Sequence, residues 1–562
     1  MPAKRKANST SSKTAPVKRT RASVNVSTQA SATTNNKPLA TKILIKGKVP
    51  VDPQCTMKAS TAHVLQEDDE VFNFMLNQTN LQHNNNKYYL GQVLEDDVGG
   101  GYAVWFRWGR VGKTAQTSLE PCPSKVHAIT LFEKKFRMKT GNEWQNRANF
   151  SKISGLYDLI EQDFGEVEAE EEEEGGDSKD EKVVSSRLPP EVLALVLLIS
   201  DVKAMEHQMR EMNYDARRAP LGKLTPAQIK AGYEALKVVS DCIEELERCT
   251  ASSGTSGKGR RRGSKSAASK GCSESEVRER LLQACNTFYT RIPHDFGMRI
   301  PPLISTPEAV KTELDLLKAL EDIEVAFSII KKKSKAVNVH PADRNYDNLK
   351  CRIKPLAAGD KMDKLIKDYV SITHAPTHSS YDLEVLQVFE LEKDGEAESF
   401  LDYGTRRLLW HGSRITNWMG ILGRGLKIAP PEAPCTGYMF GKGVYFADCA
   451  SKSANYTYPS STKNVGIMAL CEVSLGEINP LVAGDINANQ LPKGKHSVQG
   501  VGRSMPDPST WITLDDGVVV PCGKLIESKV DSAVLWYNEF IVYDIRQIRL
   551  RYLVQLKFKY NY

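Results

Sequence analysis

The sequence predicts a multidomain protein of 562 residues, in which an α+β domain, an all-α helical bundle and a predominantly β domain with short helices follow one another. Three patterns predict this order. Residues alternate with a period of two at 102–108, apolar residues recur at helical spacing within 186–332, and strict alternation returns at 548–558. A chain of this length can hold several domains that each bury a core.

Composition narrows the class of protein. Apolar residues make up 40% and charged residues 26% of the chain, which is ordinary for a globular protein. The 11 cysteines include no C-x-x-C pair, so we predict no disulfide framework, no cysteine zinc site and no metal. No apolar run reaches the roughly 18 residues of a membrane span. We therefore expect an intracellular protein without a membrane partner.

Residues 1–60 are predicted to form a disordered basic tail. They are rich in Ser, Thr, Ala, Asn and Lys and contain too little apolar surface to order themselves. The clusters Lys4-Arg5-Lys6 and Lys18-Arg19-Thr20-Arg21 are typical of nuclear localisation or nucleic-acid contact. A tail that only increases solubility is the alternative. A basic end attached to a folded body favours an anionic partner.

Residues 61–165 are predicted to form the α+β domain. A strand with one apolar face covers 102–108, and Leu131 to Phe136, with Trp144, predict a helix behind the sheet. The strand ends at Trp108-Gly109-Arg110. An arginine beside a flat indole can pair a phosphate while the ring stacks on a sugar or base. The alternative is that Trp108 belongs to the core and Arg110 is an ordinary surface charge.

An acidic linker at 166–185 leads into a helical segment at 186–332. One apolar helical face is predicted from Val192, Leu195, Val196, Ile199, Val202, Met205 and Met209. Thr225-Pro226-Ala227-Gln228 has the form of a capping box, and Pro307 opens another long helix. The Gly/Ser-rich stretch at 251–271, which includes three arginines, predicts a flexible loop.

Residues 338–562 are predicted to be mainly β, with strand-like runs at 467–474 and 539–543. Within them, the stretch 410–456 combines glycines, aromatics, one histidine and several hydroxyls with little charge. Exposed backbone at glycines, flat side chains and hydroxyls together suit a cleft for a planar, uncharged ring that carries an amide.

The motifs in this stretch resemble those of a known family. Trp410-His411-Gly412-Ser413, the run Gly441 to Asp448 and the run Ser451 to Tyr456 resemble the catalytic domain of the poly(ADP-ribose) polymerases. Trp108-Gly109-Arg110 is the signature of the WGR domain, and Pro220 to Leu224 matches the connecting motif of the family's regulatory helical domain. The resemblance implies a WGR DNA-binding domain at 61–165, a regulatory helical domain at 186–332 and an ADP-ribosyltransferase catalytic domain at 338–562.

The resemblance also implies residue roles. His411, Tyr445 and Glu539 would be catalytic, with Glu539 stabilising a ribosyl cation and orienting the attacking hydroxyl. The other expected contacts to NAD are Gly412, Ser413, Gly420, Lys427, Ser453 and Tyr456. The expected acceptor-side residues are His378, Met439 and Lys452, and the expected DNA contacts are Trp108, Gly109 and Arg110.

The implied function is that of a nuclear, DNA-break-activated poly(ADP-ribose) polymerase that uses NAD as its substrate and no metal. Its expected partners are damaged DNA with nicks or breaks, histones and itself as acceptors, and a partner protein that completes the serine-acceptor site. The alternative is a DNA-end-binding scaffold that performs only mono-ADP-ribosyl transfer or whose catalysis is dispensable. A dehydrogenase is disfavoured because no G-x-G-x-x-G follows a strand.

Overall fold

The computed structural model describes residues 49–68, 70–163, 185–214, 223–253, 273–330, 339–460 and 462–561. The basic clusters of the tail, the acidic linker apart from its last residue, Pro220 to Gly222, and residues 254–271 of the predicted loop lie outside these ranges. We call the described parts the N-terminal region (49–163), the helical region (185–330) and the C-terminal region (339–561).

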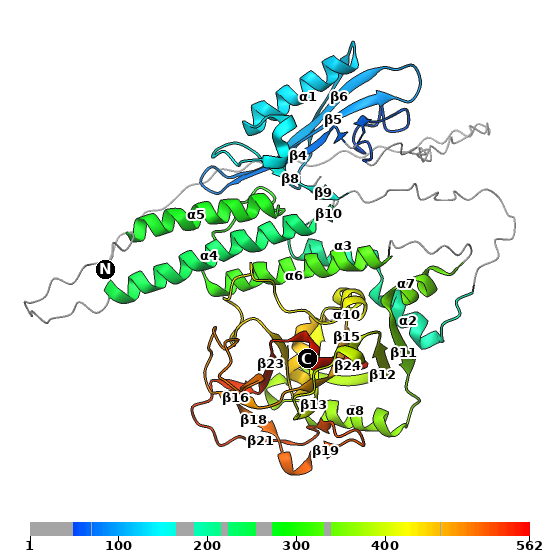
Figure 1. Ribbon diagram of the computed structural model, residues 1–562, viewed down its shortest axis with the longest axis vertical. Helices are drawn as coiled ribbons and strands as arrows, with labels where there is room; N and C mark the ends of the chain where they lie inside the picture. The colour runs from blue at the N-terminus through cyan, green and yellow to red at the C-terminus, as the bar shows by residue number, and fades with distance from the viewer. Residues whose placement is uncertain are drawn as a thin grey trace, which may run out of the picture. The chain divides into compact units, whose positions relative to one another are not determined.

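The N-terminal region is built on one antiparallel sheet of order β7-β6-β5-β4-β8, with β1 paired to β5. Its elements are β1 (Ala62–Val64), β2 (Gln66–Glu67), β3 (Glu70–Val71), β4 (Asn73–Asn80), β5 (Asn85–Asp96), β6 (Tyr102–Arg110), β7 (Gln116–Cys122), α1 (Lys125–Thr140), η1 (Trp144–Asn149) and β8 (Asp158–Ile160). The predicted strand is β6. The predicted helix is α1, which lies over one sheet face (Figure 1) and packs Phe132 and Phe136 against Phe74.

The other face of this sheet is covered by residues that the sequence assigned to the disordered tail. Val49, Val51 and Cys55 are buried in the core beneath Trp105. Asp52 lies nearby and receives a hydrogen bond of 2.6 Å from Nε of Arg107, which is itself buried. Because a buried guanidinium requires a carboxylate partner, this pair fixes residues 49–60 on the sheet. The expected tail boundary at residue 60 is therefore wrong.

The helical region contains α2 (Pro190–Ile199), α3 (Val202–Glu211), α4 (Pro226–Ser253), α5 (Glu274–Arg291) and α6 (Pro307–Ile330), and a short β10 (Lys223–Leu224) that pairs with β9 (Gln162–Asp163). The predicted single face at 192–209 belongs to two helices, because Asp201 caps a new helix with its side chain and accepts from the Ala204 amide. Helix α4 packs against both α5 and α6 (Figure 1).

Two further details of the helical region differ from expectation. The Thr225 hydroxyl accepts from the Gln228 amide at 3.1 Å, as a capping box requires, but the Gln228 side chain donates to the Arg291 carbonyl instead of returning to Thr225. Helix α4 continues to Ser253, so the first three residues of the predicted loop at 251–271 are helical.

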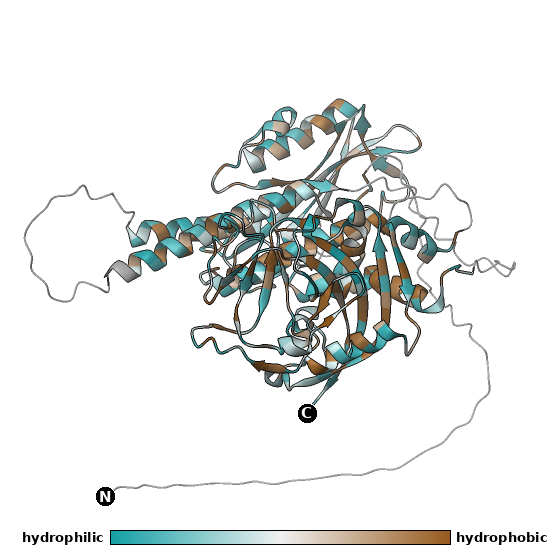
Figure 2. Cartoon of the chain, turned by 60° about the horizontal axis from the view of Figure 1, so that its bottom comes forward, coloured by the Kyte–Doolittle hydropathy of each residue, from teal (hydrophilic) through white to brown (hydrophobic). Residues whose placement is uncertain are grey.

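The C-terminal region contains three sheets. The largest has the order β11-β12-β24-β15-β13-β20-β19, the second β14-β23-β17-β16 and the third β21-β18-β22. Their strands are β11 (Cys351–Pro355), β12 (Tyr381–Lys393), β13 (Arg406–Ser413), β14 (Val444–Phe446), β15 (Val465–Ser474), β16 (Ile478–Leu481), β17 (Ser497–Gly500), β18 (Gly502–Pro506), β19 (Ile512–Thr513), β20 (Val519–Val520), β21 (Leu525–Glu527), β22 (Leu535–Tyr537), β23 (Glu539–Val542) and β24 (Ile548–Tyr560). Apolar and polar residues alternate along β24 as predicted, except at Tyr552 to Val554, which are all buried. Figure 2 shows hydrophobic and hydrophilic residues interleaved along the ribbons.

Short helices connect these strands, as the sequence predicts. They are α7 (Pro341–Leu349), α8 (Lys361–Ile372), η2 (Pro376–His378), α9 (Glu396–Ser399), η3 (Ile415–Asn417), α10 (Trp418–Arg424), α11 (Ala450–Ala454), η4 (Asn455–Thr457), η5 (Pro508–Thr510) and η6 (Ile545–Gln547). A backbone bridge between Trp410 and Ala447 links the largest sheet to the second. This bridge sets β13 beside β14.

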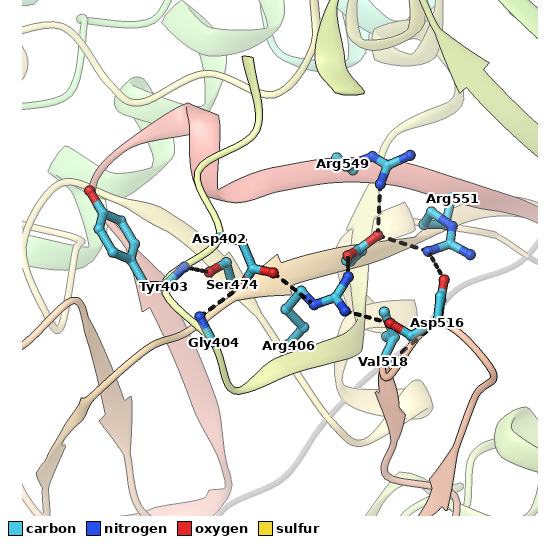
Figure 3. A network of polar contacts seen from close by, with 10 residues as sticks. Asp402, Tyr403, Gly404, Arg406, Ser474, Asp516, Val518, Arg549 and Arg551 are labelled. Atoms are coloured by element: carbon cyan, nitrogen blue, oxygen red, sulfur yellow. Dashed lines mark hydrogen bonds and ion pairs between the residues drawn. The ribbon is translucent and has the colours of Figure 1, made fainter. Parts of the chain in front are cut away.

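A buried carboxylate ties three strands of the largest sheet together. Glu472 on β15 is fully buried, and its oxygens lie 2.8 Å from Arg406 on β13 and 2.8 Å and 3.4 Å from Arg551 and Arg549 on β24. Figure 3 shows these guanidinium groups converging from neighbouring strands, with Arg551 also reaching Asp516. The arrangement satisfies one buried charge with several donors.

We expect Glu472→Gln to lower the stability of the C-terminal region by about 3 kcal/mol, because removing one partner of a buried ion pair leaves the others uncompensated. Urea unfolding of the purified variant measures this change. The matched control is Glu384→Gln, which removes an exposed pair with Lys559 and should cost less than about 1 kcal/mol. Equal losses in the two variants would contradict the assignment.

Candidate active site

A cavity of about 450 Å³ opens in the C-terminal region where β13, β14 and β23 meet. Most residues that the sequence assigned to catalysis or to NAD line this cavity. They are His411, Gly412, Ser413, Lys427, Tyr445, Ser453, Tyr456 and Glu539. Two acceptor-side residues, Met439 and Lys452, line it as well. Side chains that are far apart in sequence therefore share one hollow.

His411 enters the cavity from the end of β13 with a defined tautomer. Its Nδ1 lies 2.9 Å from the backbone carbonyl of Tyr445, which can only accept, so Nδ1 carries the proton. Burial lowers the pKa of the imidazole below its usual 6.5, and the ring is therefore neutral at pH 7. Its Nε2 is then available as a hydrogen-bond acceptor.

The Tyr445 ring is fixed in place by its own hydroxyl. The phenol donates to the Gly441 carbonyl at 2.7 Å and accepts from the Phe440 amide at 3.0 Å. Burial raises the pKa of this phenol, so it stays neutral. Tyr456, the second expected stacking ring, is 46% exposed, and burial of its hydroxyl raises that pKa to about 12. The cavity thus offers uncharged aromatic surface.

Gly412 permits β13 to approach α11. A Cβ at this position would lie 1.9 Å from the backbone oxygen of Ser453, a distance that no side chain tolerates. The Ser453 hydroxyl donates to the Trp410 carbonyl at 3.0 Å and keeps its lone pairs for an incoming donor. This close approach places the Gly412 backbone and the Ser453 hydroxyl next to each other on the cavity wall.

Glu539 lies at the start of β23, and its carboxylate is ion-paired with Lys452 at 2.9 Å. Both side chains are 14% exposed. The same ammonium group donates to the backbone carbonyls of Tyr537 at 2.8 Å and Asn538 at 3.3 Å. Lys452 therefore holds both the carboxylate and the segment that leads into it.

Two residues assigned to the site do not line the cavity. Gly420 lies on α10, where a Cβ would sit 3.3 Å from the backbone oxygen of Asp322 on α6, so its smallness serves helix packing. His378 donates or accepts at 2.8 Å with the Ser451 hydroxyl and packs on the Tyr537 ring. It does not line the cavity.

Part of the cavity wall comes from α6 of the helical region. The contributing side chains are Lys311, Asp315, Lys318, Ala319, Glu321 and Asp322. Glu321 pairs with Lys427 of the C-terminal region at 3.1 Å, and burial raises the pKa of Asp322 to about 7. The sequence predicts the apolar face of α6 but not its charged face. The charged residues at 311, 315, 318 and 322 recur at helical spacing, and we call them the charged stripe of α6.

In the N-terminal region, the Trp108 ring stacks on Tyr89 with 5.6 Å between centroids and 16° between planes. Lys139 lies over the same Tyr89 ring at 4.7 Å, and Lys87 lies over Tyr157 at 5.3 Å. Burial and the charges of two other lysines lower the pKa of Lys139. We call these five residues the lysine–aromatic cluster. Sequence reasoning found Trp108 alone, because the lysines come from β5 and α1.

Arg110 has partners other than those expected. Its Nε donates to the Gly297 carbonyl at 2.5 Å and its Nη2 to the Arg299 carbonyl at 2.8 Å, both in the loop before α6. Its Nη1 donates to the Asn84 carbonyl at 2.6 Å. The guanidinium is thus engaged with carbonyl groups of the helical region and of Asn84. Gly109 lies within β6 between the two.

Across the described ranges, no group of three or more His, Cys, Asp or Glu side chains is placed to bind a metal ion. Among the same residues, none of the helices combines the length and apolarity that a bilayer span requires.

Three family models match the chain. The WGR domain model matches residues 72–151, the poly(ADP-ribose) polymerase regulatory domain model matches 186–346, and the poly(ADP-ribose) polymerase catalytic domain model matches 363–558.

Curated relatives match over most of the chain. Human poly [ADP-ribose] polymerase 2 is 46% identical over 529 residues, which cover 92% of this chain and 85% of the relative. The Arabidopsis thaliana poly [ADP-ribose] polymerase 2 is 40% identical over 512 residues, covering 90% and 76%. The Gallus gallus poly [ADP-ribose] polymerase 1 is 40% identical over 524 residues but is covered for only 48% of its length.

Proposed function

Because the chain belongs to the poly(ADP-ribose) polymerase family, we propose that it cleaves NAD at the cavity described above, releases nicotinamide and builds ADP-ribose chains on proteins when DNA is broken. It is an NAD-dependent ADP-ribosyltransferase with a WGR domain. The observation that carries the residue assignments is that His411, Tyr445 and Glu539 line one cavity although they come from three strands.

The cavity supports a defined pose for NAD. The Gly412 backbone and the Ser453 hydroxyl hold the carboxamide, while Tyr445 and Tyr456 cover the faces of the nicotinamide ring. The free Nε2 of neutral His411 accepts a hydrogen bond from a ribose hydroxyl. Holding the ring and the ribose separately orients the bond to be broken.

Glu539 acts on the other side of that bond. When the bond between the nicotinamide nitrogen and the ribose carbon breaks, neutral nicotinamide leaves with the electron pair and the ribose becomes cationic. The Glu539 carboxylate stabilises this cation and accepts the proton of the attacking hydroxyl. Lys452 holds the carboxylate in position. During chain growth, the last ADP-ribose unit already attached to the acceptor supplies the attacking hydroxyl.

The resemblance to the family also supports a proposal for the acceptors and the location. We propose that proteins, including histones and the enzyme itself, receive ADP-ribose in the nucleus, and that a partner protein completes the site when serine is the acceptor. We assign Met439 and Lys452, which line the cavity, to the acceptor side, and His378 to an indirect role through its contact with Ser451.

The lysine–aromatic cluster is the proposed DNA contact. Lys87 and Lys139 supply positive charge beside three aromatic rings, of which Trp108 is half-buried. Phosphates suit the lysines, and an exposed sugar or base at a break suits the rings. Direct hydrogen bonds join this region to α5, including one of 3.0 Å from the Asn77 side chain to the Thr290 carbonyl. DNA binding is thereby connected to the helices that wall the cavity.

Incubating the purified chain with NAD, with and without a nicked duplex, tests the proposed function. We expect a ladder of modified protein that depends on the nicked duplex. A single added unit, or no modification, under both conditions would instead support a DNA-end-binding scaffold with mono-ADP-ribosyl transfer or dispensable catalysis.

We expect Arg110→Ala to abolish most of the stimulation by DNA while DNA affinity falls by less than about threefold, because a side chain that makes no phosphate contact changes affinity little. The physical reason is that its guanidinium bonds to the helical region. Activity without DNA should remain. Fluorescence anisotropy with a labelled nicked duplex measures affinity, and the NAD assay measures stimulation.

Lys139→Ala provides the contrasting result. It should weaken DNA binding and reduce the slope of log affinity against log salt by about 0.9. Lys134→Ala, an exposed lysine on the same helix, is the matched control and should change neither quantity. If Arg110→Ala and Lys139→Ala weakened DNA binding equally, the division of roles between them would be wrong.

A second expectation concerns pH. NAD binding requires His411 with Nε2 unprotonated, and burial lowers the pKa of His411 below 6.5. Protonation at acid pH removes the acceptor, so kcat/KM should stay level down to pH 6.5 and fall only below it. The measurement belongs in an Asp322→Asn background, because a carboxyl with a pKa of about 7 titrates in the same cavity. An acid limb centred above pH 6.5 in that background would contradict the tautomer assignment.

A further inference from the structure

The segment that carries Glu539 is held by a second, fully buried contact. Asn538 is 1% exposed, and its Nδ2 donates to the Asp448 carboxylate at 2.7 Å. Its Oδ1 accepts from the Gly502 amide at 2.9 Å and from the Gln499 side chain at 3.2 Å. Both polar atoms of the Asn538 side chain thus bond to protein groups that do not line the cavity.

Asp448 is an unusual partner, because it is an acid with 1% exposure. Its Oδ2 receives Asn538, whereas its Oδ1 is buried without a hydrogen-bond partner. Arg407 and Lys452 lie close enough to favour the charged form, although burial raises the pKa of the carboxyl overall. A buried, incompletely satisfied carboxylate is costly.

Asp448 follows directly from the strand that carries Tyr445. Ala447 exchanges backbone hydrogen bonds of 2.8 Å and 3.0 Å with Trp410, the residue before His411. A link from Asp448 to Asn538 therefore connects the ends of β13 and β14 to the start of β23. The three residues that act on NAD lie on these same strands, His411 on β13, Tyr445 on β14 and Glu539 on β23.

We propose that Asp448 and Asn538 form a positioning pair that sets where Glu539 stands relative to His411 and Tyr445. The pair touches neither the cavity nor its contents, since neither residue lines the cavity. The pair holds the backbone at the start of β23, while Lys452 holds the Glu539 carboxylate. Gly502 completes the clamp, because a Cβ there would lie 2.4 Å from the backbone of Tyr537. The inference rests on the proposed function of Glu539.

The test compares a single variant at Asn538 with a double variant in which the side chains of Asp448 and Asn538 are exchanged. Asn538→Asp sets two carboxylates together where one hydrogen bond stood, so the start of β23 must move. The expected result is a fall in kcat of between about 10-fold and about 100-fold, the scale of a displacement near 1 Å, with KM for NAD changed less than about twofold. The double variant Asp448→Asn with Asn538→Asp restores a donor and acceptor of the same shape, and should recover most of kcat.

The pH profile separates positioning from a loss of fold. In Asn538→Asp the two facing carboxyls can share one proton at low pH, so its activity relative to the parent should fall as pH rises. Arg407 and Lys452 are the charged groups that face the pair, and Tyr369 and Cys449 are the titratable groups beside Asp448. Asp363→Asn, which alters another buried carboxylate on α8, is the matched control and should leave kcat unchanged.

Each outcome decides the matter. An active parent with an equally active Asn538→Asp variant, or a loss that the double variant does not recover, would overturn the positioning pair while leaving the proposed function standing. A parent without NAD-dependent modification would overturn the proposed function itself. If Asn538→Asp does not fold, recovery of folding and of kcat together in the double variant still supports the pair, and a folded but inactive double variant refutes it.

Discussion

Replacing Glu539 by glutamine should abolish chain growth while NAD still binds. Glutamine has nearly the same shape as glutamate, so the cavity keeps its form, but it supplies no negative charge to the ribosyl cation and accepts no proton from the attacking hydroxyl. Removing one such electrostatic contact costs about 10²- to 10³-fold in kcat. Radiolabelled NAD with gel analysis should show no polymer, and NAD binding measured by calorimetry should change little.

The ion pair with Lys452 supplies the control. Lys452→Met removes the ammonium that holds Glu539 but leaves the carboxylate in place, so it should shorten the polymer without abolishing transfer. If Glu539→Gln produced polymer as long as that of the parent, Glu539 would have no part in elongation. If Glu539→Gln lost NAD binding as well, the residue would hold substrate rather than act on the reacting bond.

The separation of these strands in the chain explains why residue patterns alone could not assemble the site. His411 and Glu539 stand 128 positions apart (539 − 411), on strands of two different sheets. They meet because the bridge between Trp410 and Ala447 joins those sheets. The spacing of apolar and polar residues along the chain does not predict such a bridge. The sequence placed the residues only through motifs that resemble a family, and the same motifs named Gly420, which packs α10 on α6 in the structure.

Elements with a local pattern were predictable. Strands β6 and β24 and helix α6 each carry an internal period, and the structure confirms them. The break between α2 and α3 was missed because one apolar face continues across it while Asp201 stops the first helix and starts the second. Residues 49–60 were missed because their order depends on Arg107, more than forty residues away.

The role of Arg110 shows a different limit. Its position at the end of a strand beside Trp108 suits a phosphate contact, and composition offers no reason to prefer another partner. The structure gives the guanidinium to carbonyl groups of a loop nearly two hundred residues later. An arginine donates equally well to phosphate and to carbonyl oxygen. Only the tertiary contact distinguishes the two kinds of partner. It changes the expected effect of replacing Arg110 from weaker DNA binding to weaker stimulation of activity by DNA.

Weakening α6 should raise activity in the absence of DNA. Leu317 on α6 is fully buried and packs against Gly232 of α4, away from the cavity. Leu317→Ala removes that contact at a cost of about 3 kcal/mol. If the helical region restrains NAD by walling the cavity, its loosened state becomes about 100-fold more populated. Activity without DNA should then rise roughly tenfold or more, up to the DNA-stimulated rate of the parent.

The matched control places a similar defect elsewhere. Ile366 on α8 is equally buried within the C-terminal region, and Ile366→Ala should lower stability by a comparable amount without raising basal activity. In Leu317→Ala the ratio of activity with DNA to activity without it should fall, while the maximal rate stays close to that of the parent. A Leu317→Ala variant that is destabilised yet keeps the parent's low activity without DNA would contradict this prediction. Loosening α6 would then not have increased the access of NAD to the cavity, so the charged stripe of α6 would not restrict that access.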